Sequence, residues 1–417
     1  MPAEDQVRDS IDHLFRHRAG QMVSILARRF GVVNIELIED SVQDALVAAM
    51  KTWPYSGVPE NQSAWLIQTA KNRVIDQLRR GAKSESIEAS ELDVPDDRPD
   101  DTRFESELTE DQIRMMFACC HPEVPADSRV ALTLKIVSGF NVVEIARAYL
   151  AKDEAIAKML TRAKQKLRTL DLEIPAGAAL NERIDSVLRV LYLMFNEGYS
   201  ASEGIDLTRQ DLCEEAIRLG KLLADHPQTS LPKVEALISL FLFQAARLSA
   251  RTDAAGDLLL LAEQDRSLWD RGMLAAGLEH FRMAAAGDDL SEYHIEAEIA
   301  SVHALSPDYT ATDWERIVAC YDELLKRKFS PVVALNRLVA LGETHGNEAA
   351  LIELSELASN YLMTSFNLYH VTRGHFLTRV DRVAEAIESY KRAAELTKNE
   401  PVQRFIRRKI EMLESYE

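Results

Sequence analysis

The chain has 417 residues, 47% of them hydrophobic and 28% charged, a composition that excludes disordered and collagen-like proteins and suits two or three domains. Its 49 Lys and Arg against 67 Asp and Glu give a net charge of -18, which as an average argues against a general nucleic-acid binder. No apolar run approaches the roughly 18 residues of a membrane span, and the acidic start is unlike a signal peptide. We therefore expect a cytoplasmic protein, and its four cysteines are too few for a disulfide framework.

The charge is distributed unevenly and divides the chain into four segments. Residues 1–83 carry eleven basic and ten acidic side chains, whereas residues 84–111 carry two basic and twelve acidic ones. Residues 112–172 are basic, with ten against six, and residues 173–417 are acidic, with 26 against 39. Like charges and two prolines predict that residues 84–111 form an extended, flexible linker. A second break is expected at residues 173–179, where Pro175 and Gly177 interrupt the helical pattern.

Apolar residues recur at a spacing of three and four along most of the chain, which predicts an all-α fold. One helix is expected over residues 34–53, with Asn34 as its cap. Its apolar stripe consists of Ile38, Val42, Ala45, Leu46, Ala49, Met50 and Trp53. The outer face carries Asp40, Gln43 and Asp44, and periodicity alone assigns these side chains to an ordinary solvated surface.

A second helix, over residues 63–80, has an unusual polar side. That side carries Trp65, Gln68, Thr69, Asn72, Arg73, Asp76, Arg79 and Arg80. Such a mixture suits a platform for single-stranded nucleic acid, because an indole stacks on an unpaired base, amides read base edges and arginines neutralise phosphates. An ordinary surface with one exposed aromatic residue is an equally good interpretation.

Residues 127–170 have the pattern of a helix-turn-helix. Asn141 with Glu144 predicts a capping box at the start of a short helix, and Asp153 opens a longer one. The polar face and flanks of the longer helix carry Lys158, Thr161, Arg162, Lys164, Gln165, Lys166 and Arg168. A helix that reads the major groove needs such donors and cations, although a basic solvated helix would look similar.

Taken in order along the chain, these segments resemble those of bacterial sigma factors of the extracytoplasmic-function (ECF) group. Residues 7–80 resemble sigma region two and residues 128–168 resemble region four, so the segments become region two (1–83), the acidic linker (84–111), region four (112–172) and a C-terminal extension (173–417). The resemblance implies that the protein binds core RNA polymerase, through the β′ clamp and the β flap, and promoter DNA. The residues implied to bind polymerase are Asp40, Gln43, Asp44, Ala45, Met50 and Trp53. The polar side of the 63–80 helix would read the minus-ten element, and the polar face of the region-four helix would read the minus-35 element.

Residues 173–417 resemble the extension of one ECF subgroup, which is built from tetratricopeptide-type helix pairs. The resemblance is carried by residues 191–204, 263–271, 312–317 and 331–337. Independently, Gly374, Leu377, Ala386, Tyr390 and Ala393 keep the spacing of such a repeat. The resemblance implies that the extension regulates the sigma factor, by an intramolecular contact with the sigma domains or through an unidentified protein or peptide partner.

Sequence motifs of catalysis are missing, so we expect no enzyme, no cofactor and no metal. Cys119, Cys120 and His121 are interpreted as structural residues, and His294 with Glu298 as a surface pair. The set Asn196, Glu197 and Tyr199 is a candidate regulatory pocket or interdomain latch, with a polar helix end as the alternative. The competing hypothesis for the whole chain is a helical-repeat interaction scaffold whose N-terminal modules only pack.

Overall fold

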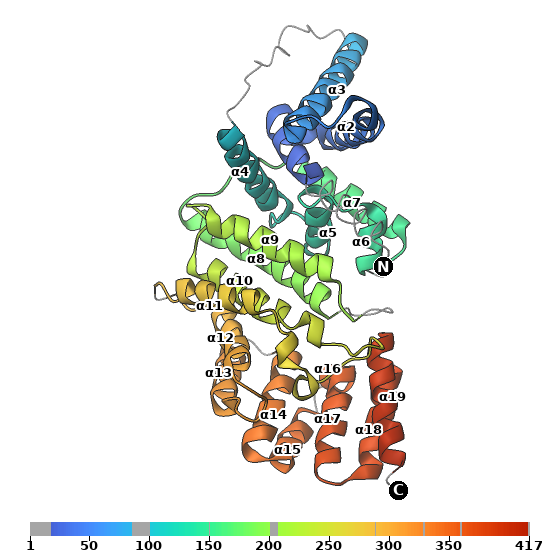
Figure 1. The fold of residues 1–417 in the computed structure, drawn as a ribbon, viewed down its shortest axis with the longest axis vertical. Coiled ribbons are helices and arrows are strands. Elements are labelled where there is room, and N and C mark those ends of the chain that lie inside the picture. The colour runs from blue at the N-terminus through green and yellow to red at the C-terminus, as the bar shows by residue number, and fades with distance from the viewer. Residues whose placement is uncertain are drawn as a thin grey trace. The chain divides into compact units, whose positions relative to one another are not determined.

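The structure, a computed structural model, describes residues 18–85, 101–149, 151–200, 207–287, 289–327, 330–358 and 361–415 (Figure 1). In these ranges the regular elements are helices, and the pairing of Thr252 with Leu258 is an isolated bridge that is not part of a sheet. The fold is therefore all-α, as the periodicity predicted. The chain forms two compact units, Met1–Leu191 and Tyr192–Glu417. Predicted features at residues 1–17, 86–100 and 201–206 lie outside the described residues.

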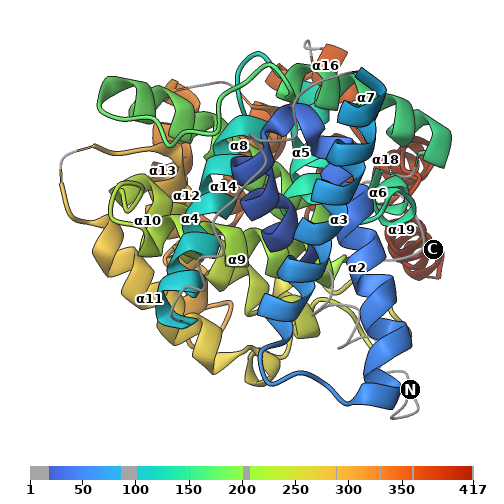
Figure 2. The ribbon, with the colours of Figure 1, turned by 90° about the horizontal axis from the view of Figure 1, so that it is seen from above.

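In the described residues, the first unit consists mainly of helices. A helix covers residues 18–30. It is followed by η1 (Val32–Asn34), α2 (Ile35–Ser56), α3 (Gln62–Glu85), α4 (Asp101–Cys119), α5 (Ala126–Ile136), α6 (Val142–Tyr149), α7 (Asp153–Leu167) and the first part of α8 (Ala178–Tyr199). Helices α2 and α3 lie side by side in both views (Figures 1 and 2). They bury the apolar sides that their sequences predicted, with Ile38 and Val42 on α2 and Ala70 and Val74 on α3.

Two local predictions in this unit were wrong. Residues 101–111, expected in the extended linker, belong to α4. The charge pattern misled because Asp111 is buried and pairs with Arg28, 2.9 Å away, so its charge is balanced by a distant part of the chain. Asn34 stands at the N-cap position of α2 but makes no side-chain cap; its amide donates instead to the Phe30 carbonyl at 2.7 Å.

The second unit contains the end of α8 and a series of helices, most of which pack on a neighbour in the chain. Its helices are α9 (Gln210–Asp225), α10 (Pro232–Ala245), α11 (Arg271–Ala284), α12 (Glu292–Leu305), α13 (Trp314–Arg327), α14 (Pro331–His345), α15 (Asn347–Leu357), α16 (Tyr361–Thr364), α17 (Asn367–Arg379), α18 (Val383–Leu396) and α19 (Glu400–Glu414), with short η3 (Leu248–Ala250), η4 (Leu261–Glu263) and η5 (Arg266–Leu268). A Cβ atom on Gly374 of α17 would lie 2.9 Å from the Tyr390 ring of α18. Only glycine therefore lets these two helices approach so closely.

Residues 251–270, here called the connecting segment, join α10 to α11 through irregular chain and two short 3-10 helices. Asp257 in this segment pairs with Arg404 of α19 at 2.5 Å, and Glu263 pairs with Lys409 at 3.5 Å. Leu258 and Leu260 pack against the apolar core that α14 to α19 build. The connecting segment thus ties the early part of this unit to its last helix.

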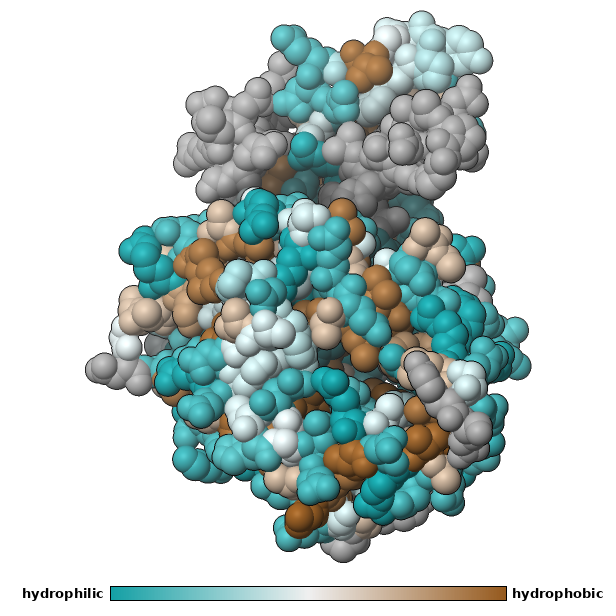
Figure 3. All heavy atoms as spheres, turned by 60° about the horizontal axis from the view of Figure 1, so that its bottom comes forward, coloured by the Kyte–Doolittle hydropathy of each residue, from teal (hydrophilic) through white to brown (hydrophobic). Residues whose placement is uncertain are grey.

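The molecular face in Figure 3 is mostly hydrophilic, and its hydrophobic side chains lie in small separate patches. Scattered apolar residues of this kind are normal on protein surfaces. None of the helices in the described ranges has the length and apolar character needed to cross a membrane.

Candidate functional site

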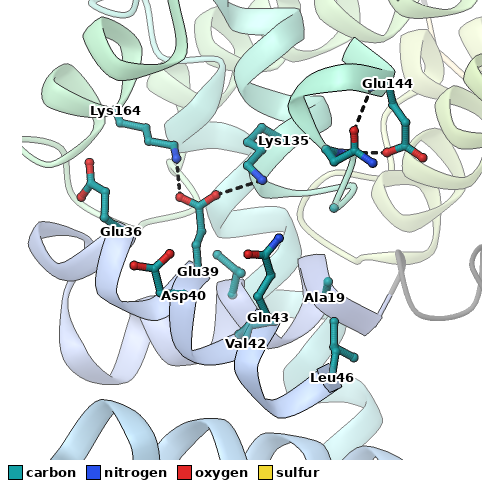
Figure 4. Close-up of a pocket in the computed structure, with 13 residues that line it drawn as sticks. Ala19, Glu36, Glu39, Asp40, Val42, Gln43, Leu46, Lys135, Glu144 and Lys164 are labelled. Carbon is teal, nitrogen blue, oxygen red and sulfur yellow. Dashed lines mark hydrogen bonds and ion pairs between the residues drawn. The ribbon is translucent and has the colours of Figure 1, made fainter. Parts of the chain in front are cut away.

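The acidic face of α2 meets basic residues of α5 and α7 within the first unit. Glu39 of α2 lies between Lys164 of α7, at 2.5 Å, and Lys135 of α5, at 3.5 Å (Figure 4). The Glu39 side chain is 13% exposed, and the two lysine side chains are 14% and 19% exposed. Charges this far from water are screened weakly, so this contact is stronger than an ordinary surface ion pair.

The contact extends along α2 and surrounds a pocket. Glu36 accepts a hydrogen bond from Nε of Arg168 at 3.0 Å, close to the end of α7. The pocket has a volume of about 480 Å³, and Asp40 and Gln43 project into it from the same helix as Glu39 (Figure 4). The surface predicted for polymerase and the cations predicted for duplex DNA therefore face one another.

The other predicted polymerase-binding residues differ in exposure. Asp44 and Met50 are exposed, although the periodicity had placed Met50 in the apolar stripe. Trp53 is half-buried and lies edge-on to Trp65 of α3, with ring centroids 5.6 Å apart. Ala45 is completely buried, so its assignment to a contact surface was wrong. Its position on the helix is next to exposed residues, but its methyl group faces the core.

The polar side of α3 is exposed where the sequence placed it. The exposed members are Gln68, Asn72, Asp76, Arg79 and Arg80, whereas Trp65, Thr69 and Arg73 are half-buried. The Gln68 amide donates to Asn72 at 3.0 Å, and Arg73 pairs with Asp44 of α2 at 2.5 Å. The side chains on this face are thus held by one another and by α2, which limits their conformational freedom. That they read a promoter element is still a prediction.

Helix α7 begins at Asp153, as predicted, and buries the stripe of Ile156, Leu160, Ala163 and Leu167. The capping box of α6 is confirmed, since Asn141 and Glu144 exchange side-chain hydrogen bonds at 2.7 and 2.9 Å. The exposed polar face carries Lys158, Thr161, Arg162, Gln165 and Arg168, with Lys164 and Lys166 half-buried at its sides. Lys166 pairs with Glu123, so both flanking lysines, like Arg168 on the exposed face, are already held by acidic residues of the same unit.

The three residues of the candidate regulatory pocket have different environments. Glu197 pairs with Arg209 at 2.8 Å, and Asn196 is exposed. Tyr199 lies under the Arg251 guanidinium, 3.8 Å from its ring centroid, and is the member of the set that lines a cavity. In the described residues Tyr199 thus lines a cavity, and a pocket formed jointly by the three residues stays a prediction.

The cysteines have structural environments. Cys119 and Cys120 are buried, and burial raises the pKa of the Cys120 thiol to about 12. No group of three His, Cys, Asp or Glu residues suited to a metal ion occurs within the part of the chain that the structure describes. The expected surface pair of His294 and Glu298 was wrong, because His294 is buried against the Ala284 carbonyl at 3.1 Å and Glu298 pairs with another helix.

Two family models match parts of this chain, and one known protein resembles nearly all of it. Residues 14–84, which include α2 and most of α3, match the family model of sigma-70 region 2. Residues 183–285 match a family of unknown function, DUF6596. An uncharacterized protein of Rhizobium meliloti (strain 1021) is 36% identical over 403 residues, which cover 94% of the chain and 93% of that relative. No solved structure matches. The region 2 match supports a sigma factor and implies core RNA polymerase and promoter DNA as partners.

Proposed function

The chain belongs to the same family as the Rhizobium meliloti protein, and from its sigma-70 region 2 we propose that it is an ECF-type sigma factor. It binds core RNA polymerase and directs promoter-specific initiation of transcription. The observation that carries this proposal is the region 2 match over residues 14–84, which coincides with the two helices whose polar faces are exposed. This role requires no catalysis and no cofactor, and it is performed in the cytoplasm, where core polymerase works.

In this proposal the two helices of region two have separate tasks. Asp40, Gln43 and Asp44 of α2 contact the clamp of the polymerase β′ subunit, with Met50 and Trp53 further along the helix. On α3, the half-buried ring of Trp65 is held in place by its edge-on contact with Trp53. This ring stacks on an unpaired base of the minus-ten element. The exposed amides beside it supply hydrogen bonds to base edges, and the arginines at the end of the helix supply charge for phosphates.

Helix α7 is proposed to read the minus-35 element as duplex DNA, with α5 and α6 as its support on the polymerase β flap. Lys158 and Arg162 are exposed and make no ion pair with another residue of the described ranges, which leaves them available for DNA. Each reading surface is small, and the acidic remainder of the chain repels phosphate. Mounting both surfaces on polymerase raises the effective concentration of each at its promoter element and makes one specific reader from two weak ones.

Residues 173–417 are proposed to regulate this activity as a tetratricopeptide-like extension. Support comes from the close packing of α17 on α18 at Gly374 and from the series of paired helices that surrounds it. Either an intramolecular contact with the sigma domains or an unidentified protein or peptide partner would transmit the control.

Run-off transcription with purified core polymerase tests the proposal. The wild-type protein should support promoter-specific initiation on fragments enriched from the source genome. The Trp65→Ala and Arg162→Ala variants should each lose roughly 5- to 150-fold of this activity, since each removes a contact worth roughly 1–3 kcal/mol. Arg282→Gln, on the exposed surface of α11, is the matched control for loss of an arginine and should retain full activity.

If folded wild-type protein neither binds core polymerase nor supports initiation, the sigma proposal is wrong and the scaffold hypothesis replaces it. The regulatory role is tested separately by a shortened protein that ends at Ser200. This end point keeps Arg183 and Ser186 of α8, which bind the Phe117 and Cys120 carbonyls at 2.8 and 2.6 Å. Changed promoter output with retained polymerase binding would support regulation, and unchanged output would refute it.

A further inference from the structure

The second unit contains a cavity of about 490 Å³ to which the sigma proposal assigns no role. Residues from α12, α13, α14, α17, α18 and α19 line it, together with Leu260, Leu261 and Ala262 of the connecting segment. Its aromatic lining consists of Tyr199, Tyr309, Trp314, Tyr321, Tyr390 and Phe405. The volume lies in the range of pockets that bind small organic molecules, and flat rings on several walls are the usual means of holding an aromatic ligand.

The charge of the lining is positive, in contrast to the acidic chain. Arg247 and Arg379 line the cavity, and neither makes an ion pair with another residue in the described part of the chain. The Arg247 guanidinium lies over the Trp269 ring at 5.4 Å, and its Nε is 3.4 Å from Gln264. Arg247 is half-buried, and no carboxylate pairs with its terminal nitrogens within the described residues.

The acidic residue among the lining side chains is already engaged. Glu343 accepts a hydrogen bond from the Tyr309 hydroxyl at 3.0 Å, and burial, aided by the charge of Glu343, raises the Tyr309 pKa above its usual range. Glu343 keeps its negative charge, but it forms no ion pair with Arg247 in the described residues. Two arginines against this one acid leave an excess of positive charge in the lining.

His303 provides a neutral polar group beside these cations. Burial and the neighbouring Arg247 and Arg266 lower its pKa to about 3, so the imidazole is uncharged at neutral pH. Its Nδ1 atom is buried and has no hydrogen-bond partner among the described residues. The ring packs edge-on against Trp314, with centroids 5.3 Å apart, which fixes its orientation toward the aromatic lining.

We propose that this cavity is a binding site for a small organic anion with a flat aromatic body, whose carboxylate or sulfonate group pairs with Arg247. The aromatic lining stacks on the body of the ligand, and Nδ1 of His303 provides a hydrogen-bond partner beside the charged group. Because the connecting segment and α19 both contribute to the wall, a ligand here also strengthens the tie between the two ends of this unit. The site does not depend on the sigma proposal. In a sigma factor, binding of this ligand would stabilise one state of the second unit.

Two probes of nearly identical shape separate charge recognition from simple apolar binding. Anilinonaphthalene sulfonate carries an anionic group, and N-phenylnaphthylamine has the same ring system without it. Titration of the full-length protein, followed by probe fluorescence, should show one site at which the sulfonate binds at least about tenfold more tightly, a difference of about 1.4 kcal/mol. Saturating sulfonate should also raise the midpoint of thermal unfolding.

Three variants locate the binding. Arg247→Gln should weaken the sulfonate by about tenfold and leave the neutral probe within about twofold. Arg379→Gln tests in the same way whether the charge of the other lining arginine contributes to sulfonate affinity. Val339→Trp fills the cavity and should abolish binding of both probes. Arg282→Gln, which lies outside the lining, is the control for a lost arginine, and circular dichroism shows that each variant is folded.

Equal affinity for the two probes in the wild-type protein would overturn the proposal. So would sulfonate binding that neither arginine variant nor Val339→Trp reduces, because the probe would then occupy an adventitious apolar surface only. Neither result involves transcription, so failure here is distinguishable from failure of the sigma proposal.

Discussion

Replacing Glu39 with Gln should loosen the contact between α2 and the α5 and α7 helices. The substitution keeps the shape of the side chain and removes its charge. Lys164 and Lys135 then lose the acidic partner that lies 2.5 and 3.5 Å away in the wild-type protein. Both lysines are less than a fifth exposed, so water replaces the lost interaction only in part.

The size of the effect follows from this partial burial. An exposed ion pair contributes about 0–1 kcal/mol, and removing one partner of a fully buried pair costs about 3–5 kcal/mol. A carboxylate that is 13% exposed and contacts two cations lies between these limits, at about 2 kcal/mol. This corresponds to about a 30-fold change in the equilibrium between the closed and the opened contact.

Native-state hydrogen exchange is the appropriate assay, because a chain of two units does not unfold in one step. Amides of α2, α5 and α7 should exchange about 30-fold faster in Glu39→Gln, while those of α13 to α19 are unchanged. The control is Glu279→Gln in α11, whose pair with Arg282 is 57% and 73% exposed, so that water screens it and its loss should leave exchange unchanged. Unchanged exchange in α2 and α7, or an equal loss in the control, would refute the reasoning.

Three further outcomes are expected. Gly20→Ala should cost about 1–3 kcal/mol in calorimetry, because its Cβ would lie 2.0 Å from the Val137 carbonyl oxygen, whereas Gly272→Ala, which meets no backbone atom, should cost nothing. Burial outweighs Arg28 and raises the pKa of Asp111 from 3.8 to about 6, so the folded state holds this proton more tightly than the unfolded state does. That contribution to stability is complete below about pH 4 and is lost as the pH rises through about 6, by up to roughly 3 kcal/mol. Urea unfolding of Asp111→Asn should therefore lack this pH-dependent part of the stability. A pH profile identical to that of the wild-type protein would contradict this. Iodoacetamide at about pH 8 should leave Cys120 unmodified in native protein and alkylate it after denaturation, which mass spectrometry detects.

The helices and their buried sides could be predicted because they depend on local periodicity. The stripe from Ile156 to Leu167 is buried as its spacing required, and the capping box at Asn141 forms because both partners lie within one turn. The exposed face of α3 followed from the same geometry. Such features need only neighbouring residues, so a single sequence contains the necessary information.

Features that depend on distant residues were not predictable in this way. Periodicity places Glu39 near the start of α2 but cannot bring Lys135 and Lys164 to it, since they lie on other helices. The linker prediction failed at Asp111 for the same reason, because its partner Arg28 is far away along the chain. Of the candidate regulatory residues, Tyr199 lines the cavity, and the remaining lining comes from segments with no shared local pattern.

The acidic face of α2 has two competing uses in the proposed sigma factor. Holding Lys164 and Arg168 engages Glu39 and Glu36, which lie beside the residues that would bind polymerase, and also occupies cations that would bind duplex DNA. With about 2 kcal/mol from Glu39 and less than about 1 kcal/mol from the more exposed Glu36, closure would weaken either partner by roughly 30- to 150-fold. A nanomolar interface contributes about 12 kcal/mol, so polymerase can open this contact readily. By thermodynamic linkage, opening by polymerase then frees α7 for DNA, which makes promoter reading dependent on prior assembly with the enzyme.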